Sequence, residues 1–317
     1  MRPLLVFCLA ASSCLCLCLS AQVKFTPDKE IFIDIDGKPF STFYYGADAN
    51  KPYLSPLRSA SGKIVTRLFP MLTVEGESRD HYHHRGLWIT YKDVNGVNFW
   101  ENDPSYTDRG PVGRVVVRNA DMKPGDKSGI LTATMDWIAP TGKVLLVESR
   151  FMQFYSDPKL RTIDIVETFA AVQNVDFGDV HDGLLGIRLA EPFTERKGGL
   201  MTNSEGLTKM MQVWGKRSNW VDYTGVVEGE RLGVGIFDNP KNPGYPNRWH
   251  ARDYGLFAAD PLAEKAFDDS LPEKHTKLPA GQKLTYRWRV VIHPGDWKAA
   301  DIPEMYKEYT AKAEGSK

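Results

Sequence analysis

The stretch that decides the fold lies near the start of the chain, where residues 31–45 read IFIDIDGKPFSTFYY. Apolar and polar side chains alternate through residues 31–35, and residues 38–45 are again rich in β-branched and aromatic side chains. Asp36-Gly37 between them tolerates the positive φ angles of a two-residue hairpin turn. The stretch therefore predicts two antiparallel strands joined by a tight turn.

The same kind of segment recurs along most of the chain. Further strands are predicted at residues 86–92, 97–101, 112–119, 130–138, 144–155, 160–170, 184–190, 232–237 and 284–293, with a second hairpin turn at Asn95-Gly96. Consecutive strands with short links favour antiparallel pairing. After Asp301, apolar residues recur at helical spacing and predict one helix. We expect an all-β antiparallel β-sandwich, with a mutarotase-like supersandwich as one form of it, and a short C-terminal helix.

Composition narrows the class of protein. Lys and Arg number 40 and so do Asp and Glu, so the chain has no net charge that would attract nucleic acid or an anionic membrane. Hydrophobic residues make up 42% and charged residues 25%, as in an ordinary globular protein, which excludes a disordered or collagen-like chain.

The first 21 residues resemble a secretory signal peptide. Arg2 is followed by an apolar stretch that ends at small residues, and all four cysteines fall within it. Cleavage would leave one domain, residues 22–317, without a thiol and with a net charge of about −1. We therefore expect a periplasmic or extracellular protein without a transmembrane segment. A lipoprotein attached through Cys14 is the alternative.

Three of the seven histidines fall within residues 81–88, which read HYHHRGLW. Alternation along an extended strand would put His81, His83 and Arg85 on one side of it. His84 and Trp88 would then lie on the other side. Histidine transfers protons near neutral pH, arginine holds a carboxylate through paired hydrogen bonds, and tryptophan offers a flat face to a sugar ring. The cluster predicts a binding or catalytic site, with structural hydrogen bonding or a metal site as alternatives.

Other candidate residues lie further along the chain. Glu101 is a candidate acid or base, with an exposed strand-end glutamate as the alternative. Glu167, among apolar neighbours, is either a general acid or the partner of an arginine. The remaining candidates are Arg188, Trp220, Asp222, His250, Arg252 and Tyr254. Together these residues predict a sugar or sugar-acid site, unless they form separate surface patches.

Taken together, the motifs resemble the bacterial PmoA-like family, also called methane oxygenase PmoA. The matching positions are His83 to Trp88, Asn95-Gly96, Phe99-Trp100, Gly183, Gly186 to Arg188, Trp214-Gly215, Trp220 to Tyr223, Asn242-Pro243, Trp249-His250 and Arg252 to Leu256. The sequence departs from the family pattern at Asn239, His181-Asp182 and Asp260. The resemblance implies a secreted β-rich protein associated with sugar catabolism, and no methane monooxygenase activity, because the mature sequence has no spanning segment.

We expect a secreted carbohydrate-active enzyme that cleaves a glycoside or modified sugar by hydrolysis or elimination. In this hypothesis His84 and His250 transfer protons, and Asp222 or Glu101 acts as acid or base. The substrate-binding residues are expected to be His83, Arg85, Trp88, Arg188, Trp220, Arg252 and Tyr254.

The expected substrate is a small molecule or an oligosaccharide, with no metal, other cofactor or nucleic acid; the oligomeric state is not predicted. One alternative is a non-catalytic carbohydrate-binding protein. Another is a His-ligated metal enzyme, an oxygenase as the family name suggests.

Overall fold

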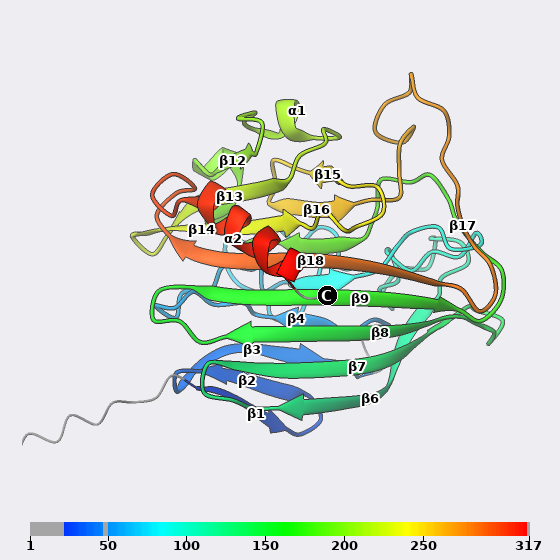
Figure 1. The fold of residues 1–317 in the computed structure, drawn as a ribbon, viewed down its shortest axis with the longest axis horizontal. Helices are drawn as coiled ribbons and strands as arrows, with labels where there is room; N and C mark the ends of the chain where they lie inside the picture. The colour runs from blue at the N-terminus through cyan, green and yellow to red at the C-terminus, as the bar shows by residue number, and fades with distance from the viewer. Residues whose placement is uncertain (1–21, 47–49, 316–317) are drawn as a thin grey trace, which may run out of the picture.

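The computed structural model describes residues 22–46 and 50–315 of the chain. In this part, two eight-stranded antiparallel sheets pack face to face, which confirms the predicted β-sandwich (Figure 1). The expected signal peptide, with Cys14, lies outside the described residues. No helix within the described ranges is long and apolar enough to cross a lipid bilayer.

Each sheet combines strands from distant parts of the chain. The first sheet has the order β1 (Val23–Pro27), β2 (Ile31–Ile35), β3 (Lys38–Tyr44), β4 (Tyr53–Ser55), β5 (Leu87–Ile89), β11 (Leu185–Arg188), β16 (Leu256–Asp260), β15 (Arg248–Ala251). The second sheet has the order β12 (Leu200–Asn203), β13 (Trp220–Val227), β14 (Glu230–Asp238), β18 (Lys283–Pro294), β9 (Arg161–Ala171), β8 (Val144–Tyr155), β7 (Ser128–Ile138), β6 (Arg114–Lys123).

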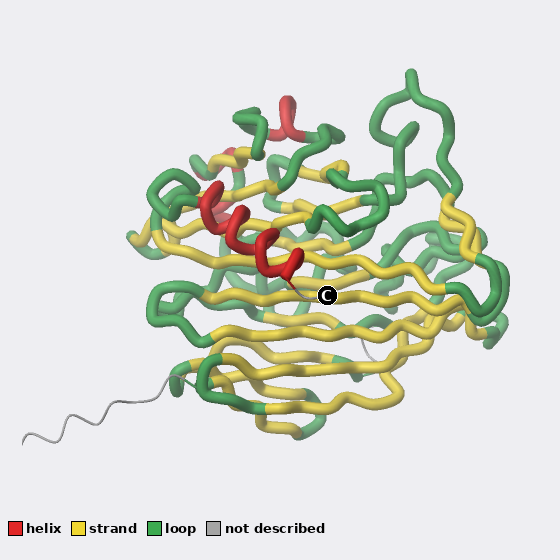
Figure 2. The backbone as a smooth tube through the Cα atoms, in the orientation of Figure 1, coloured by secondary structure: helices red, strands yellow, loops and turns green. Residues whose placement is uncertain are grey.

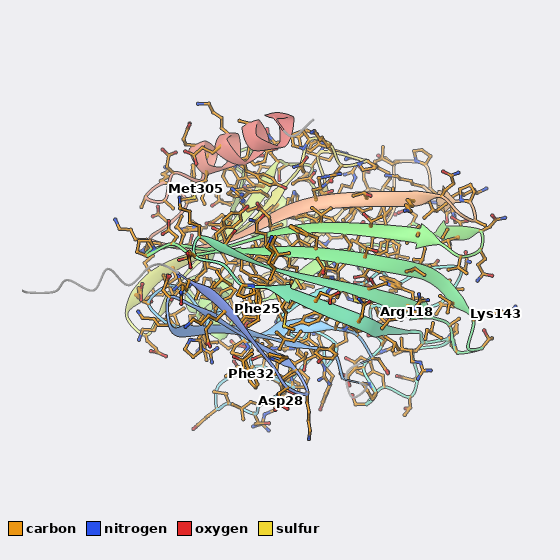
Figure 3. All side chains as sticks on the ribbon, turned by 60° about the horizontal axis from the view of Figure 1, so that its bottom comes forward. Phe25, Asp28, Phe32, Arg118, Lys143 and Met305 are labelled. Carbon is orange, nitrogen blue, oxygen red and sulfur yellow. The ribbon has the colours of Figure 1, made fainter. Side chains whose placement is uncertain are left out.

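The smaller elements lie around the two sheets, and the last helix lies across the outer face of the second sheet (Figure 2). They are the pair β10 (Val175–Phe177) and β17 (Thr276–Leu278), the 3-10 helices η2 (Glu191–Phe193) and η3 (Glu195–Lys197), and the helices α1 (Met210–Val213) and α2 (Ile302–Gly315). The predicted C-terminal helix is thus confirmed. Its Ile302 and Tyr309 are buried against Trp220 and Phe237 of the second sheet. Figure 3 shows Met305 of α2 and Phe32 of β2 on opposite sides of the sandwich.

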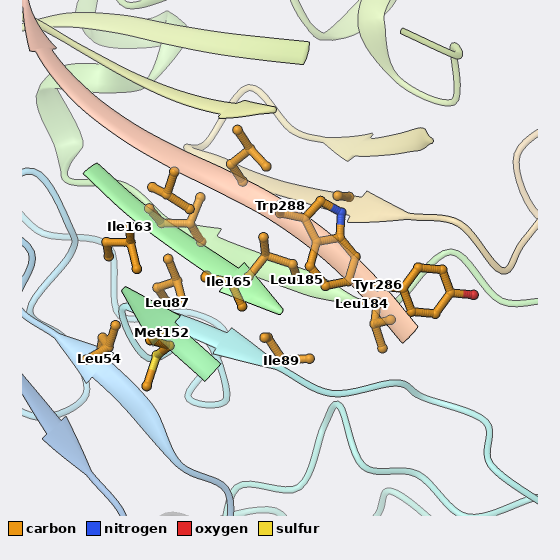
Figure 4. Packing of buried hydrophobic residues seen from close by; sticks show 14 of the residues in the cluster. Leu54, Leu87, Ile89, Met152, Ile163, Ile165, Leu184, Leu185, Tyr286 and Trp288 are labelled. Carbon is orange, nitrogen blue, oxygen red and sulfur yellow. The ribbon is translucent and has the colours of Figure 1, made fainter. Parts of the chain in front are cut away.

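The core lies between the two sheets. Alternate residues of facing strands point inward, as the period of two in a strand requires. Figure 4 shows Leu87 and Ile89 of the first sheet close to Ile163, Ile165 and Trp288 of the second, and all are buried. Such interdigitated apolar layers fix which face of each strand points away from the core.

The two predicted hairpins had different outcomes. Asp36 and Gly37 have φ angles of 56° and 71°, and β2 pairs with β3 as expected. The second hairpin is confirmed only around its turn, and its predicted strands are not formed at the expected length. A turn does form at Asn95-Gly96, but β5 ends at Ile89 and residues 97–101 form no strand. Val94 and Val97 exchange two backbone hydrogen bonds of 3.1 Å, and the Phe99 amide donates to the Tyr91 carbonyl at 3.1 Å. The Asn98 amide instead donates to the Pro111 carbonyl at 2.8 Å.

Candidate functional site

A row of directly paired residues crosses the outer face of the first sheet. Trp88 is paired with Gly186, Gly186 with Ala258, and Ala258 with His250. Directly opposed residues of antiparallel strands point to the same face. The alternate residues of these strands pack in the core between the sheets. The row therefore faces away from the second sheet, and the loops above it can build a site on this floor.

A column of four stacked rings stands on this floor; we call it the histidine stack. Tyr254 lies 5.2 Å from His81, His81 lies 4.7 Å from His84, and His84 lies 5.1 Å from Trp88, all between ring centroids. The planes of His81 and His84 differ by only 3°. Trp88 is fully buried, whereas the side chain of His81 is 39% exposed. The stack presents His81 to solvent and holds His84 beneath it.

Backbone geometry explains why His81 and His84 meet. The predicted alternation required an extended segment, but β5 begins only at Leu87. His81 has a φ of 45°, and the His84 amide donates to its carbonyl at 2.9 Å. This turn places two residues that are three positions apart on the same side. The expected separation of His81 and His84 onto opposite sides is therefore wrong.

Arg188 fixes the protonation pattern of His84. Its Nη1 lies 3.1 Å from His84 Nδ1. Because a guanidinium only donates, Nδ1 must accept and the neutral ring carries its proton on Nε2. Burial, with the nearby His83 and Arg188, holds the pKa of His84 well below its usual value. His84 is therefore a neutral, oriented imidazole.

Asp80 joins the two arginines beneath the stack to His81. Its Oδ1 accepts from Arg67 Nη1 at 2.6 Å and from Arg188 Nη2 at 2.9 Å. The same oxygen lies 3.2 Å from His81 Nδ1. Burial alone would raise the pKa of the Asp80 carboxyl, but His81 and Arg188 hold it well below its usual range. The carboxylate stays ionised and leaves His81 Nε2 as the ring nitrogen available to a ligand.

A second group, which we call the His181 cluster, consists of His181, Asp182 and His250. Asp182 Oδ1 lies 3.4 Å from His250 Nδ1 and 3.8 Å from His181 Nε2. The imidazole centroids of the two histidines are 4.7 Å apart and nearly perpendicular. Lys92 Nζ donates to the other oxygen, Asp182 Oδ2, at 2.9 Å. Burial lowers the pKa of both histidines.

Arg252 connects the His181 cluster to the histidine stack. Its Nε donates to His250 Nε2 at 3.1 Å, so the neutral His250 ring carries its proton on Nδ1. The Arg252 backbone carbonyl accepts from the Tyr223 hydroxyl of the second sheet. Tyr254 lies two residues further along, in the stack. The two groups therefore belong to one stretch of the outer face.

His83 and Arg85 have other partners. His83 Nδ1 lies 3.0 Å from the Tyr106 hydroxyl, and burial lowers the pKa of the ring well below its usual value. Arg85 forms two hydrogen bonds to Asp103 Oδ2, at 3.1 and 2.7 Å. His83 is buried and Arg85 is 12% exposed. Through these contacts both residues stabilise the loop that lies over the site.

Glu101 lies at the rim of the site. It is 3.1 Å from Lys92 Nζ, which Asp182 shares, and 3.8 Å from Arg109 Nε. With its side chain 19% exposed, Glu101 is close enough to the His181 cluster to contact the same ligand, although it is engaged by two cations.

Several expected contacts with substrate do not fit the geometry. Trp88 and Arg188 are buried and support His84. A sugar can therefore neither stack on the Trp88 ring nor bind to the Arg188 guanidinium. Asp222 and Trp220 lie on β13, on the face of the second sheet that is turned away from the first. Asp222 pairs with His293 at 2.8 Å, and Trp220 packs on Trp297.

The structure places His84 and His250 over opposite ends of the row of paired residues. Trp88, on which His84 stacks, is separated from His250 by three strand spacings, which is about 14 Å.

Sequence reasoning missed Asp80, Lys92 and the role of His181. Their positions in the sequence could have indicated two of these residues, since Asp80 directly precedes His81 and His181 directly precedes Asp182.

A separate cavity of about 430 Å³ lies on the outer face of the second sheet. Among the residues that line it are Tyr155, Asp164, Arg287, Arg289 and Tyr309. Arg289 is already held by Asp164 through bonds of 2.6 and 2.7 Å. This cavity contains none of the predicted site residues.

The fold and site define an antiparallel β-sandwich with a histidine-, arginine- and carboxylate-rich outer face. Residues 30–307 match the model of DUF6807, a family of unknown function, and the chain belongs to this family. None of the curated proteins matches the sequence. The resemblance to PmoA-like proteins stays a prediction.

Solved structures with a similar fold include the galactosidase domain of an alpha-galactosidase-sucrose kinase, AgaSK (7% identity, TM-score 0.45, 86% of this chain and 42% of that one). Another is the GH36 alpha-galactosidase AgaB from Geobacillus stearothermophilus (9%, 0.46, 86% and 41%). A third is a galactose mutarotase related enzyme from Lactobacillus acidophilus (8%, 0.37, 86% and 97%). The chain spans about two-fifths of the length of the two galactosidases. At these identities the function has to be argued from the site.

Proposed function

We propose that the protein is a secreted carbohydrate-active enzyme, which cleaves a glycoside or modified sugar by hydrolysis or elimination on the outer face of the first sheet. The observation that carries this proposal is the histidine stack. It presents His81 to solvent beside the ionised Asp80 and above the neutral His84.

His81 is the group best placed for proton transfer. The Asp80 carboxylate lies 3.2 Å from Nδ1, so Nε2 is the nitrogen that can take a proton from a substrate or give one to it. Tyr254, half-buried on the outer side of the ring, and the guanidinium of Arg252 can bind substrate hydroxyl and carboxylate groups. In this arrangement His84 and Arg188 position His81 from below.

The carboxylates of the region favour histidine chemistry over the two-carboxylate mechanism of most glycosidases. Asp80, Glu101, Asp103 and Asp182 are all ion-paired with lysine or arginine. Ion pairing favours the ionised form of a carboxyl group, whereas a glycosidase acid must carry a proton. Proton abstraction by an imidazole, as in elimination from a uronic acid, needs no protonated carboxyl group.

The test is turnover on a panel of neutral and uronic-acid oligosaccharides, monitored by new reducing ends and by the ultraviolet absorbance of an unsaturated product. The variant is His81→Asn, because asparagine tolerates the positive φ at this position. We expect a loss of about 10²- to 10⁴-fold in kcat. His275→Ala is the matched control, since the His275 side chain is exposed beside Asp176.

Wild-type turnover in His81→Asn would overturn the assignment of His81. Retention of a sugar without any product over long incubation would show a carbohydrate-binding protein and contradict catalysis.

A further inference from the structure

The His181 cluster has the donor atoms and spacing of a metal site. One ligand atom from each of His181, Asp182 and His250 lies within 4.8 Å of the others. Nitrogen and oxygen ligands at about 2.1 Å from one tetrahedral ion are about 3.4 Å from each other. The observed distances of 3.4 Å (His250 Nδ1 to Asp182 Oδ1) and 3.8 Å (His181 Nε2 to Asp182 Oδ1) are close to this value. The side chain of His181 is 37% exposed, so it can turn to close the remaining gap.

The buried nitrogen of His250 is aimed into the cluster. His250 is 3% exposed, and its Nδ1 has no hydrogen-bond partner among the described residues, although it faces Asp182. An unsatisfied buried polar atom costs about 1–3 kcal/mol. A cation between Nδ1 and Asp182 Oδ1 would engage both atoms once the ring proton has left Nδ1.

The surroundings orient the ligands. Lys92 holds Asp182 Oδ2 at 2.9 Å, which leaves Oδ1 directed at the two histidines. The exposed side of His181 leaves room for further ligands from solvent or substrate.

Metal binding at His250 Nδ1 requires a change in the contact between His250 and Arg252. It donates to His250 Nε2, which places the ring proton on Nδ1. A metal on Nδ1 requires the proton on Nε2, where it would meet the Arg252 N–H. Loading therefore moves the ring proton from Nδ1 to Nε2 and displaces the Arg252 guanidinium, which lies over the Trp214 ring at 5.5 Å. The displaced guanidinium becomes available to an anionic ligand.

We propose that His181, Asp182 and His250 bind one divalent transition-metal ion of the zinc class, with open coordination positions facing solvent. Two imidazoles and one carboxylate favour Zn²⁺, Fe²⁺ or Co²⁺ over Mg²⁺ and Ca²⁺. The site goes beyond the proposed proton transfer at His81 and stands without it. It also departs from the expectation of a metal-free protein.

The experiment uses the full chain purified without a polyhistidine tag and stripped with a chelator. Zn²⁺ is titrated by calorimetry and Co²⁺ by its visible absorption, which reports nitrogen and oxygen coordination. We expect one equivalent to bind to the wild-type protein, with at least about 10-fold weaker affinity in His181→Gln and in His250→Ala. Zn²⁺ should raise the Tm of the wild type and not of these variants.

His275→Ala is the control, because His275 also lies beside two carboxylates, Asp176 and Glu273, at 3.0 and 3.2 Å. It should bind the metal as the wild type does. No stoichiometric binding, or unchanged affinity in His181→Gln, overturns the metal site. His181 is half-exposed, so this variant should fold even if His250→Ala does not. His81→Asn should keep metal affinity while losing turnover, which separates failure of this site from failure of the proposed function.

Discussion

At the scale of single residues, the ring nitrogens of the site are fixed by donors that cannot accept. Arg188 faces His84 Nδ1 and Arg252 faces His250 Nε2, each at 3.1 Å. The two histidines therefore carry their protons on opposite nitrogens, Nε2 in His84 and Nδ1 in His250. Each arginine positions the histidine that it faces. Substitution of an arginine should therefore change the orientation and protonation of that histidine, while the imidazole itself stays in the site.

The lowered pKa of His84 makes stability depend on pH. The unfolded chain binds a proton at this residue below pH 6.5, the usual value, whereas the folded protein does not. The contribution is therefore present above pH 6.5 and is lost as the pH falls. Acidification to pH 5.5 should cost up to about 1.4 kcal/mol from this residue. His84→Asn should show a correspondingly smaller loss in urea unfolding between pH 7.5 and 5.5, and identical pH dependence would contradict the argument.

Arg188→Lys tests the positioning role. Lysine keeps the charge but cannot reach His84, Ser78 and Asp80 together, as the guanidinium does. We expect a loss of about 1–3 kcal/mol in unfolding free energy and reduced kcat with little change in KM. Arg196→Lys on the surface should change stability by less than about 0.5 kcal/mol. Wild-type kcat in Arg188→Lys would show that Arg188 has only a structural role.

At the scale of elements, the row of paired residues beneath the site depends on Gly186, because a glycine has no side chain. Gly186 lies in β11 between Trp88 of β5 and Ala258 of β16. A Cβ there would lie 2.8 Å from ring atoms of both Trp88 and Trp100. The glycine lets two indole rings lie over the strand, and Trp88 in turn supports the histidine stack.

Gly186→Ala should lower the unfolding free energy by about 1–3 kcal/mol and reduce turnover, because the tryptophans and the stack above them must move. Gly235→Ala in β14 is the control, since its Cβ would meet nothing closer than 3.4 Å. Chemical denaturation with intrinsic tryptophan fluorescence measures both effects. Equal stability of the two variants would argue against close packing at Gly186.

At the scale of the whole molecule, a buried ionic group lies between the sheets. Arg150 Nε donates to Glu167 Oε2 at 2.9 Å, and its Nη2 contacts Glu148. The interpretation of Glu167 as the partner of an arginine is thus confirmed. Burial, with the neighbouring Glu148, raises the pKa of Glu167 well above its usual value. This glutamate is enclosed in the core and cannot act on a substrate.

Arg150→Met should destabilise the protein by about 3–5 kcal/mol, because the buried Glu148–Glu167 pair loses its cation. Lys307→Ala breaks an exposed pair with Glu304 on α2 and should have an effect below about 1 kcal/mol. Urea unfolding of both variants is the measurement. A loss below 1 kcal/mol in Arg150→Met would mean that the carboxyl groups are neutral in the core.

The sequence by itself determined the class of fold and most strands. Alternation and the Asp36-Gly37 turn are local properties, so residues 31–45, 144–155 and 284–293 could be predicted with errors of a residue or two at their ends. The same patterns located most of the residues of the candidate site, because clustered histidines and arginines are rare in ordinary surface segments.

Only the tertiary structure decided which of those residues lie together. The pairing of β5, β11, β16 and β15 joins segments up to about 170 residues apart, and no local pattern specifies it. This pairing brings His81 to Tyr254 and His181 to His250, and it leaves Asp222 on the opposite sheet. The sequence specifies the type of each side chain. The distances between the side chains, their burial and their protonation follow from packing between segments that are remote along the chain.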